Sequence, residues 1–178
     1  MYVRTRFAAA PAVGAALAGG VAFAQTPDQD YSDDLERFRA SLGGLQENPS
    51  ISTRATGRFL ASARGDRIQW ELRYEDIEGG AVQQAHIHFA RPHVNGGISV
   101  WLCGSIPTTP AGVQRCPQEG EIEGVIQGAN VVGPTGQGIG PGQLNEVIRQ
   151  MRRGATYANV HSATFPGGEI RGQIRLRG

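Results

Sequence analysis

The sequence contains no lysine, so arginine supplies all 17 basic residues, against 16 acidic ones. Charged residues make up only 19% of the chain, and the formal net charge is +1. A chain with so little net charge lacks the basic surface that nucleic-acid binding requires. We therefore expect no nucleic-acid partner.

Cysteines and long apolar runs are also scarce. The chain has two cysteines, which are too few for disulfides to replace a hydrophobic core. Beyond residue 24, no apolar run is long enough to cross a bilayer. We expect a domain with its own core and no membrane span after residue 24.

Residues 1–24 have the pattern of a secretory signal peptide. Arg4 and Arg6 precede a run of small apolar residues that ends in Ala22-Phe23-Ala24, which is typical of a cleavage site. A single-span anchor is the alternative. Residues 25–34 are polar and acidic and predict a disordered leader, followed by one domain over 35–178. We expect an exported protein that is periplasmic or extracellular.

Glycines and prolines, 26 and 10 in number, indicate many turns and favour an all-β domain. Alternation of apolar and polar residues predicts strands at 35–42, 54–63, 68–75, within 81–95, and at 98–102, 121–126, 157–162 and 169–176. One helical pattern covers 143–153. We predict a Greek-key antiparallel sandwich or barrel of about eight strands with this single short helix.

Three of the four histidines lie between Ala81 and Asn95. Side chains two apart in a strand point to the same face, so His86 and His88 share one face while Ile87 points to the other. Near the carboxyl terminus, Val160, Ile170, Ile174 and Leu176 are predicted for the core. That choice puts His161, Glu169 and Arg171 on the outer, polar side, where His86 and His88 are also predicted.

These positions predict a metal site on the outer face. His86, His88 and His161 should converge there, with His93, which follows Pro92, as a conditional fourth ligand. Cys103 and Cys116 flank one irregular loop, and in an exported protein we expect them to form a disulfide.

The strings AHIHFARPHVNGGISVWLCG and YANVHSATFPGGEIRGQI closely resemble the chordin-type CHRD domain, which is found in animal chordins and in small exported bacterial proteins. The resemblance covers about residues 35–176. In the usual pattern of that domain a glycine-rich turn follows H-I-H directly, whereas here residues 89–93 intervene. Membership implies no assigned activity.

A weaker resemblance is to Cu/Zn superoxide dismutase, an eight-stranded Greek-key barrel. It implies that His86, His88 and His161 are copper ligands, that His93 replaces the bridging histidine, and that Arg171 guides anions. The zinc ligands have no counterpart, so the resemblance implies a copper-only centre. A pairing of Arg171 with Glu169 is the alternative role for that arginine.

Two functions follow as hypotheses. The first is an exported domain that binds copper through a surface histidine cluster, with superoxide dismutase-like activity as a further step. The second is a non-enzymatic binding or matrix module without metal, in which loops 104–120 and 130–142 present a surface to a protein or glycan and the histidines only form hydrogen bonds. The sequence has no recognisable nucleophile-base-acid motif, so the residues give little support to hydrolase chemistry.

Overall fold

The structure, a computed structural model, describes residues 34–177. The predicted signal peptide (1–24) and all but the last residue of the predicted leader (25–34) lie outside the described residues. Strands occupy Glu36–Gly43 (β1), Thr56–Arg64 (β2), Arg67–Glu75 (β3), Val82–Phe89 (β4), Gly97–Gly104 (β5), Gly120–Ile126 (β6), Thr156–Ser162 (β7), Ile170–Gln173 (β8) and Arg175–Leu176 (β9). The helix is Leu144–Arg152 (α1), and the predicted all-β antiparallel fold with one helix is confirmed.

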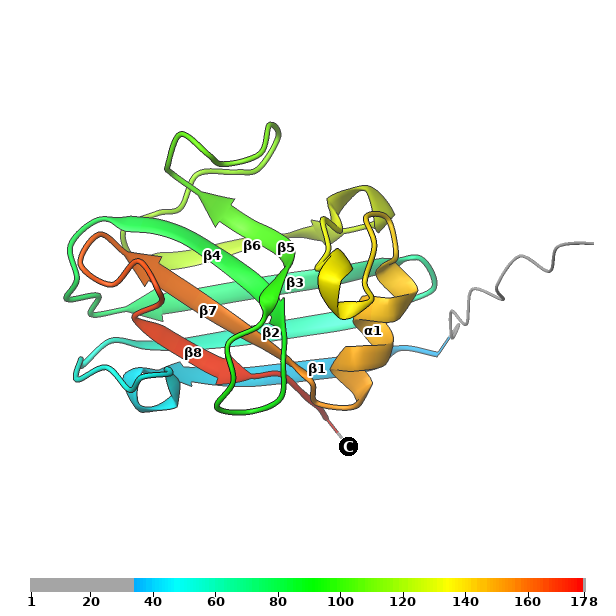
Figure 1. The fold of residues 1–178 in the computed structure, drawn as a ribbon, viewed down its shortest axis with the longest axis horizontal. Coiled ribbons are helices and arrows are strands. Elements are labelled where there is room, and N and C mark those ends of the chain that lie inside the picture. Colours follow the sequence, from blue (N-terminus) through cyan, green and yellow to red (C-terminus); the bar gives the residue numbers. More distant parts are fainter. Residues whose placement is uncertain (1–33, 178) are drawn as a thin grey trace, which may run out of the picture.

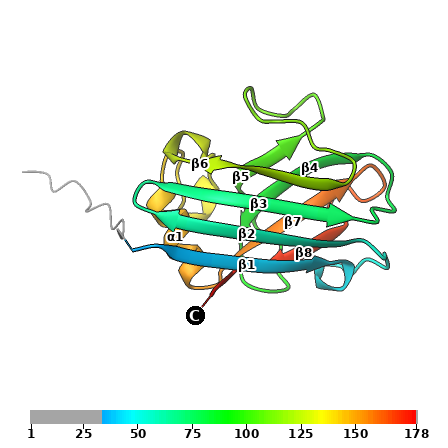
Figure 2. The same ribbon diagram turned by 180° about the vertical axis from the view of Figure 1, so that it is seen from behind.

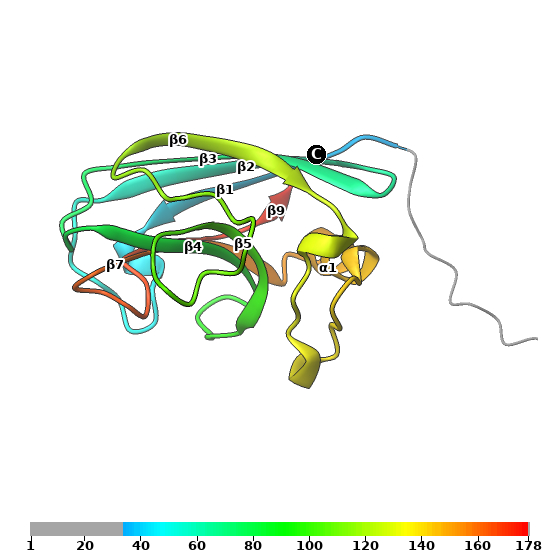
Figure 3. The same cartoon turned by 90° about the horizontal axis from the view of Figure 1, so that it is seen from above.

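The strands follow the order β5-β4-β7-β8-β1-β2-β3-β6, with β9 paired to β1. Figures 1 and 2 show the two halves of this order as separate layers, with β4, β5, β7 and β8 on one side and β1, β2, β3 and β6 on the other. Seen from above, the layers face each other and α1 lies at one end (Figure 3). The core fills the space between the layers.

Alternating burial explains why the strands form as they do. In β3 the buried residues are Ile68, Trp70, Leu72 and Tyr74, while the residues between them are wholly or partly exposed. β2 and β3, which occupy the predicted strands 54–63 and 68–75, form a hairpin joined at Gly65-Asp66, with Phe59 opposite Leu72. A strand with one apolar face is stable only when that face meets another layer, which the second sheet provides.

The last predicted strand, 169–176, is divided into two. Residues of β8 pair with β7 and, at Arg171, with Gly43 at the end of β1, whereas Arg175 pairs with Arg39 further along β1. The chain therefore passes from one layer to the other near Ile174, which is fully buried. Leu176, which we predicted for the core, is 46% exposed because it lies beyond this crossing at the margin of the molecule.

Candidate metal centre

Two neighbouring strands, β4 and β7, position the three histidines. They pair antiparallel, with His86 opposite Asn159 and His161 opposite Gln84. Ala85 and Ile87 point into the core and are fully buried, so His86 and His88 point to the outer face. Val160 takes the core side in β7, and His161 therefore joins them on that outer face, as the alternation predicts.

The outer face at this point is covered, so the predicted surface cluster is wrong. His86, His88 and His161 are only 1%, 7% and 6% exposed. Loops fold over the sheet and bond to the side chains beneath them: Gly96 contacts His88, and Pro166 contacts His161. The alternation of residues determines which face a histidine occupies but not whether a connecting loop covers it.

Backbone carbonyls determine the tautomers of two imidazoles. His88 Nδ1 lies 3.0 Å from the carbonyl oxygen of Gly96, and His161 Nδ1 lies 2.9 Å from that of Pro166. A carbonyl only accepts, so Nδ1 carries the hydrogen in both rings, and each Nε2 presents a lone pair. This arrangement is the usual second sphere of a metal-binding histidine.

His86 joins the other two through its own Nδ1. That atom lies 3.1 Å from His161 Nε2, which has only a lone pair, so His86 Nδ1–H is the donor. The Nε2 atoms of His86 and His88 are buried without a hydrogen-bond partner among the described residues. A buried polar atom without a partner is costly, and a metal ion at this point would use the lone pair of His88.

The distances fit a first-row metal after a small adjustment. One ligand nitrogen from each histidine lies within 4.8 Å of the other two, and within residues 34–177 this is the only group of three or more such side chains. Bonds of about 2.0–2.1 Å to one ion place three nitrogens about 3.5 Å apart in a planar arrangement. The side chains therefore need to move by about an ångström or less.

Burial keeps the centre uncharged. Desolvation lowers the pKa of His88 to about 4 and that of His161 to about 4, with His88 contributing to the shift of His161. The pKa of His86 falls further, to about 2, because it is buried beside both other imidazoles. All three are neutral near pH 7, which is the form that binds a metal ion.

Two aromatic side chains adjoin the histidines. The ring of Tyr157 stacks on His88 with centroids 4.8 Å apart, and Trp101 meets His86 edge-on at 4.2 Å. The hydroxyl of Tyr157 accepts a hydrogen bond from the backbone of Gly96, the residue that orients His88. These rings limit movement of the imidazoles, and sequence reasoning did not assign them to the site.

Arg171 lies beside the centre, 3% exposed, with its guanidinium 4.7 Å from the Tyr157 ring centroid. It donates to the Gln46 carbonyl and to Asn95 Oδ1, and its ion-pair partner is Glu47 at 3.7 Å. The predicted alternative of a pairing with Glu169 is therefore wrong. The role of Arg171 in anion guidance stays a prediction.

Glu47 and Asn159 complete this polar cluster. Asn159 Nδ2 donates to Glu47 Oε1 at 2.9 Å, while Asn159 Oδ1 has no partner among residues 34–177. Burial raises the pKa of Glu47 to about 7, opposed by the Asn159 hydrogen bond and by Arg171. Asn159 shares the face of His161 and could have been found by alternation, but Glu47 follows a short 3-10 turn and carries no sequence signal.

Glu169 has a separate structural role. Its carboxylate accepts hydrogen bonds from the hydroxyls of Thr53 and Ser162 and from the backbone N–H groups of Glu78 and Gly79. It is fully buried and joins the loops before β2 and after β3 to β7. Strand alternation predicted Glu169 on the outer face beside the histidines, but it lies just before β8 and bonds Ser162, which has the same parity as the core residue Val160. Only the folded loops supply its partners.

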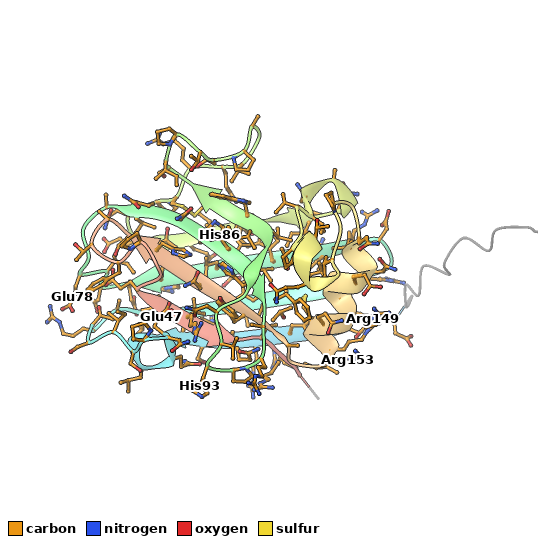
Figure 4. The ribbon with its side chains drawn as sticks, viewed as in Figure 1. Glu47, Glu78, His86, His93, Arg149 and Arg153 are labelled. Atoms are coloured by element: carbon orange, nitrogen blue, oxygen red, sulfur yellow. A yellow bond between two sulfur atoms is a disulfide. The ribbon has the colours of Figure 1, made fainter. Side chains whose placement is uncertain are left out.

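The structure does not bring His93 into the cluster. It lies in the exposed loop between β4 and β5 with a left-handed φ of 61°, and Figure 4 shows it apart from His86. Participation as a fourth ligand would require this loop to rearrange. That role remains conditional.

The predicted disulfide is confirmed between Cys103 and Cys116, which are separated by 13 residues. It joins β5 to the loop that precedes β6. Across residues 34–177, the structure contains no helix with the length and apolar character needed to span a membrane.

Comparison with known families gives one match. The family described as CHRD domain matches residues 38–174, which include all of β2 to β8 and all but the first two residues of β1, and end just before β9. No curated protein and no solved structure gives a significant match.

Proposed function

This chain belongs to the CHRD domain family, and we propose that its three-histidine centre binds a copper ion. The observation that carries the proposal is the convergence of His86, His88 and His161, two of them with tautomers set by backbone carbonyls. A metal-binding histidine usually donates its other ring N–H to a carbonyl or carboxylate, as His88 and His161 do here.

The donor set favours copper over the hard cations. Three neutral imidazoles supply nitrogen ligands only, and magnesium and calcium prefer oxygen. Among divalent first-row ions, affinity for such a site is greatest for Cu²⁺. His88 and His161 would bind through Nε2, and His86 through Nδ1 after its hydrogen moves to Nε2.

Superoxide dismutation is a further step of this proposal. A bound copper ion supplies one-electron chemistry, and the chain would have to admit a small anion to it. Arg171 is the nearby cation that would attract such an anion, but its guanidinium is only 3% exposed. Access therefore depends on movement of the covering loops, and we treat binding and dismutation as separate claims.

We also propose that the protein acts outside the cytoplasm. The pattern of residues 1–24 supports export, and a disulfide persists in an oxidising compartment.

Copper titration of purified protein tests the binding claim. Wild type should bind one Cu²⁺ per chain and quench the fluorescence of Trp101, which touches His86. In the variant His161→Gln the side-chain oxygen can still accept from His86 Nδ1, so the fold should persist while affinity falls by at least about 100-fold. Equal affinity in the two proteins would defeat the proposal and leave the histidines with hydrogen bonding alone.

Two further measurements divide the remaining possibilities. His93→Ala should keep wild-type affinity if three ligands suffice, and a weakened site would assign His93 as the fourth ligand. Superoxide decay with the copper-loaded protein, compared with His161→Gln, tests dismutation. Copper binding without faster decay would leave the binding claim in place and remove the enzymatic one.

A further inference from the structure

Five arginines gather on the exposed outer face of the other sheet, shown toward the viewer in Figure 2. They come from β1, β2, β9 and the residue after β9, and every one of their side chains is exposed: Arg37, Arg39, Arg58, Arg175 and Arg177. We call the surface that they form the arginine groove. The acidic residues of this face lie on β3, where Glu71 is the neighbour of Arg58, and on β6 at its other edge, where Glu121 and Glu123 point outward.

Strand register brings these arginines together. Arg39 pairs with Arg175 across β1 and β9, and the backbone N–H of Arg177 donates to the carbonyl oxygen of Arg37. Arg58 of β2 lies opposite Ser41, the next outward position of β1. Outward positions stand about 7 Å apart along a strand and about 5 Å apart between strands, so these arginines are close neighbours on one face. The guanidinium of Arg175 lies against Gly154, which follows α1.

A hollow of about 600 Å³ follows this array, lined by Arg39, Arg58, Arg175 and Arg177 and by no acidic residue. Two further hollows adjoin the central one. Arg37 and Arg177 line both of them, and Arg177 also lines the central hollow. One of these hollows follows β1 and β9 and also includes Glu36, whereas the other crosses β2 and β3 to β6 and also includes Glu71 and Glu123. The depression therefore continues beyond the central hollow in two directions. Its shape fits an elongated ligand better than a compact one.

Most of these cations have no counter-ion in the structure. Within residues 34–177, Arg37, Arg39, Arg175 and Arg177 form no ion pair, and Arg58 reaches Glu71 only at 3.9 Å. Like charges at this spacing repel one another, although water and salt weaken the effect. An anionic ligand would relieve the repulsion and gain forked hydrogen bonds to guanidinium groups.

We propose that the arginine groove binds a linear polysaccharide that carries carboxylate groups. Carboxylates match the two-pronged geometry of arginine, and regularly spaced sugar acids match a row of cations. The central hollow has no aromatic lining on which bases could stack, which disfavours single-stranded nucleic acid. Its concave form disfavours a membrane surface, and the apolar side chains of α1, the neighbouring amphipathic helix, are buried in the core rather than free to enter a bilayer.

This inference does not depend on the metal centre. The groove lies on the outer face of the β1-β2-β3-β6 sheet, whereas the histidines lie on the outer face of the other sheet. Failure of one claim leaves the other untouched, and the variant His161→Gln should bind polysaccharide as wild type does.

End-labelled alginate oligosaccharides, which are linear polymers of sugar acids, provide the probe. Fluorescence anisotropy with the whole protein should show binding that weakens as salt rises from about 20 to about 200 mM, because the contacts are screened. The variant Arg39→Gln/Arg177→Gln should bind at least about tenfold more weakly. The matched control Arg91→Gln/Arg115→Gln removes the same charge from exposed loop positions and should bind as wild type does.

Three results would overturn the proposal. They are absence of alginate binding by wild type, equal weakening in the two double variants, and binding of neutral dextran as strong as that of alginate. Single-stranded DNA or anionic phospholipid vesicles that bind the groove more tightly than alginate would also reject it in favour of those partners. Melting temperatures of the four proteins check that each variant is folded.

Discussion

At the scale of single residues, burial determines the charge of the histidine centre. The side chains of His86, His88 and His161 lie against one another, and desolvation alone would expel protons from such a group. The same cost makes the centre receptive to a metal ion, whose bonds replace the lost hydration of the nitrogens. Protonation and metal binding thus compete for the same lone pairs.

Stability should fall in mild acid for this reason. The folded pKa values of His88 and His161, about 4, lie below the ordinary value of 6.5. Between those limits the unfolded chain binds protons that the folded chain does not, so each histidine costs up to about 1.4 kcal/mol of unfolding free energy per pH unit as pH falls. Urea unfolding at pH 7.5 and 5.0 measures the effect.

One nearby group opposes this trend. The raised pKa of Glu47, about 7, means that the folded state binds its proton first, and this contribution increases stability as pH falls from 7 towards 4.5. As pH falls, the three histidines lower the free energy of unfolding by more than Glu47 raises it, so the protein should become less stable. His161→Gln should show a shallower decline than wild type, and a stability that is level or higher at pH 5.0 would contradict the interpretation.

Glu169 provides a second prediction at this scale. In Glu169→Gln the new amide nitrogen would face donors, leaving at least one hydroxyl or backbone N–H of its four partners unpaired in a buried site. We expect a loss of about 3 kcal/mol in unfolding free energy, measured by urea denaturation. Glu75→Gln is the matched control, because its ion pair with Arg73 is exposed and should contribute little.

The residue scale also shows what alternation can predict. The alternation of apolar and polar residues predicts that Ile87 and Val160 point into the core. It therefore also predicts that the three histidines share the opposite face. Burial of that face depends on Gly96 and Pro166, which reach the histidines through loop conformations that no periodic pattern encodes. For the same reason, the partners of Glu169 and Arg171 could not be predicted.

At the scale of elements, the sheet and the loops play different parts. The β4–β7 ladder sets the spacing of the histidines, and the loops exclude water and orient the rings. Strands, the β2–β3 hairpin and α1 could be predicted from period and turn residues. The division of the last strand into β8 and β9 could not, because it results from the closure of two sheets rather than from local sequence.

The disulfide belongs to this scale because it ties a loop to a strand. Replacing both Cys103 and Cys116 by alanine should lower the unfolding free energy by about 3 kcal/mol, as expected when a short loop is no longer closed. Copper affinity should stay the same, since hydrogen bonds of β4 with β7 hold the histidines. Denaturation curves and copper titration of the one variant test both statements, and an unchanged stability would show that the bridge is dispensable.

At the scale of the whole molecule, the two sheets expose different chemistry. One outer face is covered by loops and buries polar groups around three histidines, whereas the other is open and presents arginines. The near-neutral net charge conceals this separation, because acidic residues elsewhere on the open face, on β3 and β6, offset the arginines in the total. Composition alone therefore excluded a general basic surface but could not reveal a local one.

Copper should stabilise the whole domain and not only its site. An ion that binds the folded state alone raises the unfolding free energy by about 2.7 kcal/mol when its free concentration is 100 times the dissociation constant. For a domain of this size the melting temperature should rise by roughly 5–10 °C. Thermal scans of wild type with and without Cu²⁺ measure the shift, and His161→Gln should show little of it. An equal shift in both proteins would mean that copper binds elsewhere, because His161→Gln removes one of the three proposed ligands and should therefore reduce the stabilisation.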